Sequence, residues 1–173
     1  MHPVSLRLAV VAALACCALT ACTNPFAPAL STEQGTAPIL GDQRTVEGVF
    51  QNFRFAYVFK DTVTYGKLLD RSFSFVYRNY DKALDITWGR DEDMLATQGL
   101  FNASQLLDLI WNEIVIADGD SLGQNISRGF NLSITFSPTD VIRAQGRVSL
   151  RIERPSADVP WKIVRWRDES NYF

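Results

Sequence analysis

The chain of 173 residues has one histidine, His2, and three cysteines, Cys16, Cys17 and Cys22, and all four lie within the first 22 residues. If this segment is processed on export, the mature chain keeps no histidine and no free thiol. A Ser-His-Asp or Cys-His nucleophile cannot be built without those side chains, and zinc sites with Cys or His ligands are excluded as well. A calcium or magnesium site built from carboxylates alone is the remaining alternative, but no loop has the acidic spacing of an EF-hand. We therefore expect no catalytic nucleophile, no metal and no cofactor, and a protein that is not an enzyme is the favoured interpretation.

The N-terminus has the features of an export signal. Arg7 precedes an apolar run from Leu8 to Leu19, which has the length of a signal-peptide core and is too short to span a bilayer comfortably. The run ends in Leu19-Thr20-Ala21-Cys22, which resembles a bacterial lipobox. We expect removal of residues 1–21 and attachment of lipid to Cys22, whose several acyl chains give stable anchoring. Secretion with cleavage after Ala21, and a retained membrane helix, are the alternatives.

Residues 22–42 contain the expected lipidated cysteine and a stretch rich in Pro, Gly, Ser and Thr without periodicity, which is typical of a flexible tether. Thr23 follows the cysteine, and not the Asp that resembles an inner-membrane retention signal. The expected location is therefore the cell envelope, with a lipid anchor in the outer membrane. The net charge of −2 at pH 7 gives no indication of nucleic-acid binding. The folded domain is predicted over residues 43–173.

The pattern of apolar residues predicts helices first and strands afterwards. Helical spacing begins after Thr45, a second short helix can be capped by Asp61, and a third follows Gly89. Residues 72–77 alternate as a strand does, and 84–88 form another short one. Long strands are predicted at the end of the chain, over residues 105–116, 125–136, 147–154 and 161–170. The nearly continuous apolar character of residues 105–116 indicates a strand covered on both faces or one that carries a bulge. This order predicts an α+β fold.

Three stretches in this order resemble the NTF2-like superfamily, also called SnoaL-like or cystatin-like α+β. They are LLDRSFSFVY (68–77), WGRDEDMLATQGLF (88–101) and PWKIVRWRDES (160–170). The resemblance covers residues 43–173 and implies three N-terminal helices packed on a strongly curved, mainly antiparallel sheet that encloses a cone-shaped pocket. With the lipobox, the chain resembles uncharacterised NTF2-like lipoproteins of bacteria. Some members of the superfamily are enzymes and others only bind ligands or partners, so the fold leaves function open.

The aromatic residues of the domain are candidates for the wall of such a pocket. A hydrophobic pocket in which a few aromatic side chains present a polar N–H or O–H group suits a small apolar ligand. The alternative is that these rings fill the core, as Phe and Trp commonly do. The candidates are Phe53, Tyr57, Tyr77, Trp88, Phe101 and Trp111.

An enzyme resembling ketosteroid isomerase is the alternative function, because it needs a carboxylate base and no histidine. The positions that match its base and its oxyanion tyrosine fall near Tyr77 and Phe53, which depart from the pattern. Tyr57 is within one helical turn, and Asp81 or Asp85 can be placed near a pocket mouth. The leading hypothesis is a non-catalytic domain that binds a small apolar ligand or a protein partner in the envelope. A carboxylate-dependent isomerase or hydrolyase is kept as the second hypothesis.

Trp161 and Trp166 are five residues apart in the last predicted strand, so strict alternation places them on opposite faces. One ring then meets the core and the other lies on the polar face of the sheet. An aromatic ring on such a face favours a homodimer through the sheet.

Overall fold

The computed structural model describes residues 40–80 and 82–172, with the backbone alone for residues 170–172. The predicted signal peptide of residues 1–21, the lipid site at Cys22, the tether as far as residue 39 and the candidate Asp81 lie outside the described residues. None of the described helices is both long and apolar enough to cross a membrane.

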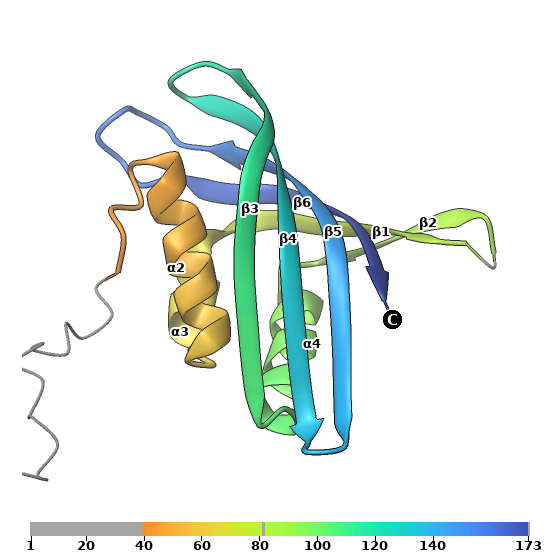
Figure 1. Ribbon diagram of the computed structural model, residues 1–173. Coiled ribbons are helices and arrows are strands. Elements are labelled where there is room, and N and C mark those ends of the chain that lie inside the picture. The colour runs from red at the N-terminus through yellow and green to blue at the C-terminus, as the bar shows by residue number, and fades with distance from the viewer. Residues whose placement is uncertain (1–39, 81, 173) are drawn as a thin grey trace, which may run out of the picture. The chain divides into compact units, whose positions relative to one another are not determined.

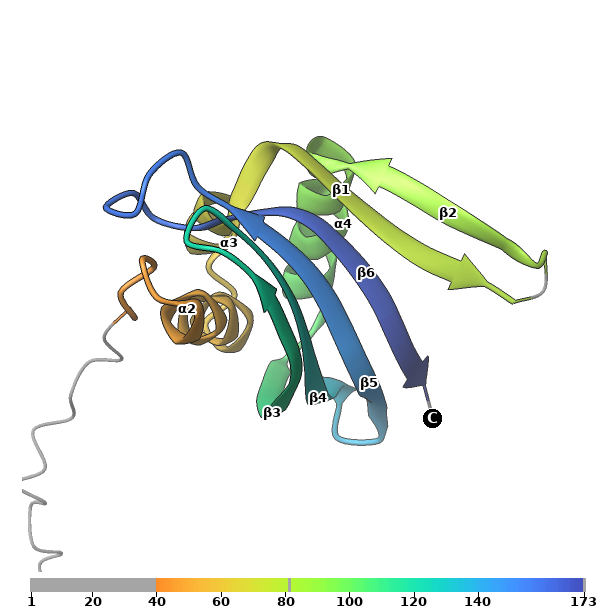
Figure 2. The same ribbon diagram turned by 90° about the horizontal axis from the view of Figure 1, so that it is seen from above.

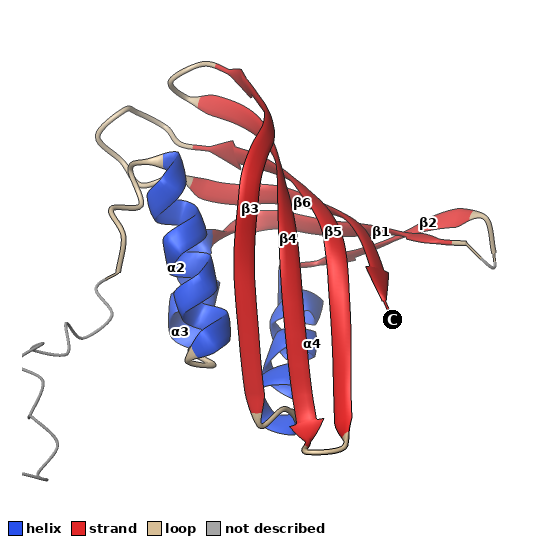
Figure 3. Cartoon of the chain, viewed as in Figure 1, coloured by secondary structure: helices blue, strands red, loops and turns tan. Residues whose placement is uncertain are grey.

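The described part contains three helices and one six-stranded sheet (Figures 1 and 3). The strand order is β2-β1-β6-β5-β4-β3, and β1 and β6 form the one parallel pair. The predicted α+β class and element order are confirmed. The elements are α2 (Val46–Val58), α3 (Thr62–Leu68), β1 (Leu69–Asn79), β2 (Leu84–Gly89), α4 (Arg90–Ala103), β3 (Leu106–Gly119), β4 (Gly123–Ser137), β5 (Asp140–Glu153) and β6 (Lys162–Tyr172).

The sheet is strongly curved, and the three helices lie on its concave side (Figure 2). Helix α2 packs along β3, while α4 contacts β1 and β2, so the helices reach both ends of the strand order. The concave face of the sheet and the helices enclose the core between them. We call this face the inner face, and the opposite face of the sheet the outer face.

Local capping fixes where the first two helices begin. The hydroxyl of Thr45 accepts the N–H of Gly48 at 3.0 Å, and the carboxylate of Asp61 accepts the N–H groups of Val63 and Thr64. Each cap satisfies backbone donors that have no partner within the helix, which stabilises a helix by about 1 kcal/mol. Both predicted caps are therefore confirmed.

Strand β3 is an edge strand whose outer face is uncovered. Leu107 and Leu109 are buried against the core, whereas Leu106 is 56% and Ile110 51% exposed. The pairing with β4 shifts register between Trp111 and Ile116. Of the two alternatives for the apolar run of residues 105–116, the bulge is confirmed and cover on both faces is wrong.

A bulge also places Trp161 and Trp166 on the same side. Both are buried, at 2% and 9% exposure, and the guanidinium of Arg154 lies 4.0 Å from the ring centre of Trp161. The pairing of β5 with β6 shifts register between Arg151 and Ile152, so one extra residue of β6 interrupts the alternation. The expectation of an outward-facing tryptophan was wrong, and this support for a sheet-face homodimer is lost.

Candidate functional site

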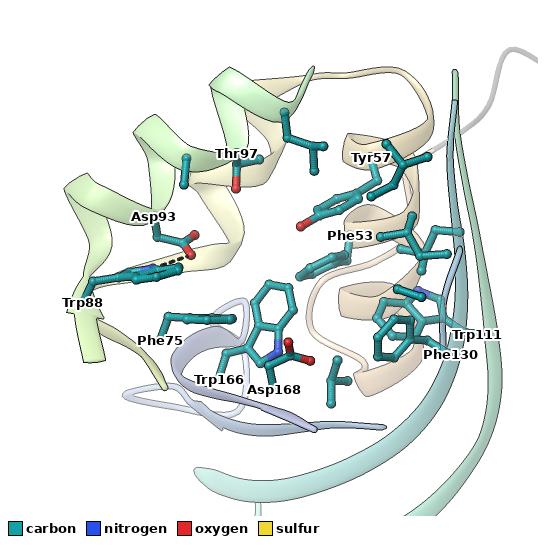
Figure 4. A pocket seen from close by; sticks show the side chains of 17 residues that line it. Phe53, Tyr57, Phe75, Trp88, Asp93, Thr97, Trp111, Phe130, Trp166 and Asp168 are labelled. Carbon is teal, nitrogen blue, oxygen red and sulfur yellow. Dashed lines mark hydrogen bonds between the residues drawn. The ribbon is translucent and has the colours of Figure 1, made fainter. Parts of the chain in front are cut away.

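A cavity of about 230 Å³, partly open to solvent, lies between α2, α4 and the inner face of the sheet. Most of the side chains that line it are apolar, because the concave face of each strand carries its hydrophobic set. Figure 4 shows the rings of its wall and the polar groups between them. It is lined by Phe53, Tyr57, Phe75, Trp88, Asp93, Ala96, Thr97, Leu100, Leu109, Trp111, Phe130, Leu132, Ile134, Ala144, Val148, Trp166 and Asp168.

The aromatic rings of the wall support one another. The ring of Phe53 has its centre 4.9 Å from Tyr57, 5.4 Å from Trp111 and 5.2 Å from Trp166. Across the cavity, Phe75 and Trp88 stack at 4.6 Å. Rings held by several neighbours have few rotamers open to them, so they cannot easily collapse into the space that they border.

Four of the six sequence-predicted candidates line this cavity, namely Phe53, Tyr57, Trp88 and Trp111. The other two are part of the surrounding packing. Tyr77 is half-buried beside Trp88, with ring centres 5.4 Å apart, and Phe101 is fully buried against Tyr57 at 5.4 Å. The structure brings the six together in one aromatic cluster, and places Tyr77 and Phe101 behind its wall.

Asp93 is a buried carboxyl group in the wall, on the first turn of α4 and only 4% exposed. The hydroxyl of Tyr65 donates to its Oδ2 at 2.7 Å, and the indole Nε1 of Trp88 donates to its Oδ1 at 3.0 Å. Burial raises the pKa of Asp93, and the two hydrogen bonds oppose the shift without cancelling it. The group therefore holds its proton to higher pH than an exposed aspartate does.

The other polar groups of the wall come from three different elements. Tyr57 on α2 points its hydroxyl toward the interior, Thr97 lies one turn beyond Asp93 on α4, and Asp168 is on β6 (Figure 4). Among the described residues that line the cavity there is no Lys, Arg or His. The site thus offers aromatic surface, hydroxyl groups and two carboxyl groups, and the described part of the chain supplies no cation there with which to pair an anionic ligand.

The three tryptophans of the wall differ in their hydrogen bonds. Trp88 donates to Asp93, and Trp111 donates to the carbonyl of Phe50 at 2.9 Å. The Nε1 of Trp166 is buried and has no hydrogen-bond partner within the part of the chain that the structure describes. It is one of three buried side-chain atoms there without a partner, and the other two belong to residues that do not line the cavity.

Sequence reasoning missed both carboxyl groups of the cavity. For Asp93 a signal was present, because Asp93, Thr97 and Phe101 recur every four residues and form the buried stripe of α4. Asp168 had no comparable signal, because its face depends on the register of β6, which the bulge between Ile163 and Arg165 shifts.

Asp85, a candidate base for the enzyme hypothesis, lies on the outer face of the sheet. Its carboxylate pairs with Arg78 at 3.1 Å and with Arg167 at 3.2 Å. The hydrogen bond from Arg78, together with Arg167, lowers the pKa of Asp85. It is therefore an ionised surface group, and its placement at the pocket mouth was wrong. Within residues 40–80 and 82–172 there is also no group of three or more side chains arranged to hold a metal ion.

No protein-family model matches the sequence, and no curated protein sequence does either. Solved structures do match. A conserved protein from Planctomyces limnophilus superposes with a TM-score of 0.66 at 13% identity, over 76% of this chain and 98% of that one. An NTF2-like protein of unknown function in nutrient uptake from Rhodospirillum rubrum superposes with a TM-score of 0.57 at 12% identity, over 75% of this chain and 98% of that one.

The domain has the NTF2-like fold. A scytalone-dehydratase-like protein from Novosphingobium aromaticivorans shares it as well, with a TM-score of 0.62 at 13% identity over 75% of this chain and 83% of that one. The resemblance read from three short stretches of sequence is confirmed at the level of the fold. NTF2-like folds serve both ligand binding and catalysis, so function has to be argued from the cavity.

Proposed function

We propose that the NTF2-like domain binds a small, largely apolar molecule in the cavity on its concave side. The observation that carries this proposal is that seven aromatic rings border the cone and still leave about 230 Å³ unfilled. An engineered apolar cavity of about 150 Å³ is large enough to take up benzene. A natural cavity of this size and lining therefore suits a molecule of one or two rings.

Binding of naphthalene to the full chain, followed by calorimetry, tests the proposal. Ala144 lines the cavity from β5, and its neighbour Gln145 is exposed on the outer face. Ala144→Phe puts a ring into the cavity, whereas Gln145→Phe adds the same ring outside it. We expect wild type and Gln145→Phe to bind, and Ala144→Phe to bind at least about tenfold more weakly. Equal binding by all three chains would place the ligand elsewhere, and no binding by wild type would refute the proposal.

Native mass spectrometry after incubation with envelope extract would then identify the natural occupant. A mass added to wild type and to Gln145→Phe, and missing from Ala144→Phe, is the expected result. The same added mass on all three chains would contradict a ligand in the cavity.

A second candidate function is catalysis by Asp93. The favouring observation is a buried carboxyl group with a raised pKa in the wall of a ligand-sized cavity, oriented by Tyr65 and Trp88. A carboxylic acid tuned toward neutrality can give or take a proton during isomerisation or elimination of water. On this hypothesis Asp93→Asn abolishes turnover of a ligand found by mass spectrometry while its binding persists. Unchanged turnover in Asp93→Asn would exclude the role.

We further propose that the chain is an envelope lipoprotein anchored at Cys22, with the domain held at the outer membrane by a tether. The support is the signal-like segment and the lipobox-like Leu19-Thr20-Ala21-Cys22. Cys22→Ala is expected to abolish labelling by radioactive palmitate and to leave the unprocessed precursor. Labelling of the variant at the wild-type level would refute the assignment.

A further inference from the structure

The unpartnered indole of Trp166 distinguishes it from the other two tryptophans of the cavity. The side chains of Trp88, Trp111 and Trp166 all line the same space. The first two have their N–H groups satisfied by the carboxyl of Asp93 and the carbonyl of Phe50. Trp166 is only 9% exposed, and its Nε1 has neither a partner in the described chain nor contact with solvent. A buried donor left in this state destabilises the fold, and proteins rarely tolerate one without a role.

The ligand cavity is where this donor can find an acceptor. Trp166 projects from β6 between Phe53 and Phe75 and borders the empty space (Figure 4). Because Nε1 is buried, the ring has to turn within its rotamer to present the N–H to a molecule bound there, and the torsion that orients a tryptophan ring has a broad minimum. An oxygen atom on that molecule would satisfy the donor, whereas a pure hydrocarbon would leave it unpaired.

Asp168 adds a second condition on the ligand. It lies two residues after Trp166 in the same strand, lines the same cavity, and is drawn on the side of the ring that carries the nitrogen (Figure 4). Asp168 already interacts within the chain, and a carboxylate with two oxygens can accept more than one hydrogen bond at the same time. One group that accepts a hydrogen bond from an N–H and gives one to a carboxylate is a hydroxyl group.

Charge and size restrict the ligand further. The lining residues include two carboxyl groups and, among the described residues, no basic side chain, so an anionic ligand would be desolvated without a counter-charge. The volume of about 230 Å³ suits one or two rings.

We propose, on the basis of the proposed binding function, that the cavity selects a neutral one- or two-ring molecule that carries a hydroxyl group. The hydroxyl oxygen accepts the hydrogen bond of Trp166 Nε1, and its proton is shared with the carboxylate of Asp168. Trp166 is thus the hydrogen-bond donor that determines the specificity of the site, whereas Trp88 and Trp111 only form part of the cavity wall.

The test compares three probes of the same ring size, naphthalene, 2-naphthol and 2-naphthoate, on the full chain. Calorimetry is expected to give an affinity for 2-naphthol about tenfold above that for naphthalene, which corresponds to the net value of about one hydrogen bond after the hydroxyl group has lost its water. For 2-naphthoate we expect the weakest binding. In Trp166→Phe the preference for 2-naphthol over naphthalene should fall to about twofold or less.

Trp111→Phe is the matched control, because it removes an indole from the same wall whose N–H already has a partner. This variant is expected to bind both probes more weakly by the same factor, so that the ratio of its affinities for 2-naphthol and naphthalene stays at about ten. The ratio is taken within one variant, and it is therefore independent of the fraction of that variant that is folded.

A second readout uses wild type alone. Of the four indole N–H signals of the chain in a proton–nitrogen correlation spectrum, the one missing from Trp166→Phe should move downfield with 2-naphthol and not with naphthalene. Binding of naphthalene and 2-naphthol with equal affinity, or an unchanged preference in Trp166→Phe, would overturn this inference and leave the proposed function intact. Failure of wild type to bind either probe would refute the proposed function, and the inference with it.

Discussion

The inner and outer faces of the sheet are built from the same strands and have opposite chemistry. On β5, Val148 and Leu150 face the core, while Arg147 and Ser149, which alternate with them, face outward. The inner face has rigid rings and a cavity. The outer face has ion pairs, of which Arg147–Glu169 at 3.8 Å and Arg167–Asp85 at 3.2 Å are examples.

This difference shows that the inner face forms the cavity and that the outer face keeps its charged side chains in water. Rings that support one another across a curved surface cannot close the gap at its centre, so the inner face acquires a site for a ligand. On the outer face, charges of opposite sign are paired along and across the strands and stay in water, where they contribute little to stability. The apolar edge at β3 is the exception on the outer face.

The largest effect is expected from two adjacent leucines of β3. Leu107 is fully buried on the inner face, and Leu106 is 56% exposed on the outer face. Leu107→Ala should lower the free energy of unfolding by about 2–5 kcal/mol, because it leaves a cavity in the core. Leu106→Ala should change it by less than about 0.5 kcal/mol at protein concentrations low enough to keep the chain monomeric. Urea denaturation of both variants measures the difference, and equal losses would mean that the outer face of β3 is covered in solution.

A homodimer through the sheet face would supply such a cover, and we propose that it forms over the exposed apolar residues of β3. Ile110 lies near the middle of the strand and is 51% exposed. Ile110→Lys should then raise the dissociation constant of the dimer at least tenfold, or about 1.4 kcal/mol, because a charge is buried in the interface. Sedimentation equilibrium measures this. A wild-type chain that stays monomeric at high concentration would refute the dimer.

A smaller effect, of opposite sign in the cavity and on the outer face, is expected on changing pH. The pKa of Asp93 is raised by burial, so its neutral form favours the fold. The stability of wild type relative to Asp93→Asn should therefore be greatest below pH 3.8 and should fall as pH rises through the raised pKa of the folded state. For Asp85, whose pKa is lowered by Arg78 and Arg167, wild type should lose stability relative to Asp85→Asn as pH falls below 3.8.

Thermal unfolding of the wild type and the two variants across this pH range provides the measurement. If the stability of wild type relative to Asp93→Asn and relative to Asp85→Asn changed in the same direction with pH, the contrast between a buried acid and a paired surface acid would be contradicted.

The smallest effect is expected at Arg147 on the outer face. Its pair with Glu169 spans 3.8 Å, and both side chains are more than 40% exposed. Arg147→Ala should cost at most about 1 kcal/mol, and the cost should vanish in high salt because mobile ions screen exposed charges. A larger cost that persists in salt, measured by urea denaturation, would show that this part of the outer face is buried.

Much of the fold could be predicted from sequence because its signals are local. The caps at Thr45 and Asp61, the helical spacing after each of them and the alternation in β4 depend on neighbours within a few residues. The aromatic members of the site could be predicted in part for the same reason. Tyr77 was predicted with Trp88 because aromatic character alone does not distinguish the wall from the layer behind it.

The sequence by itself determined the class of the domain, the order of its elements and the absence of His and Cys from residues 23–173, because composition and periodicity are carried by the chain alone. The tertiary structure decided which residues meet. A single extra residue in β6 turned Trp166 and Asp168 toward the cavity, and the curvature of the sheet left that cavity open. Register shifts and curvature arise from how strands pair and pack across the sheet, and no local pattern in the sequence records them.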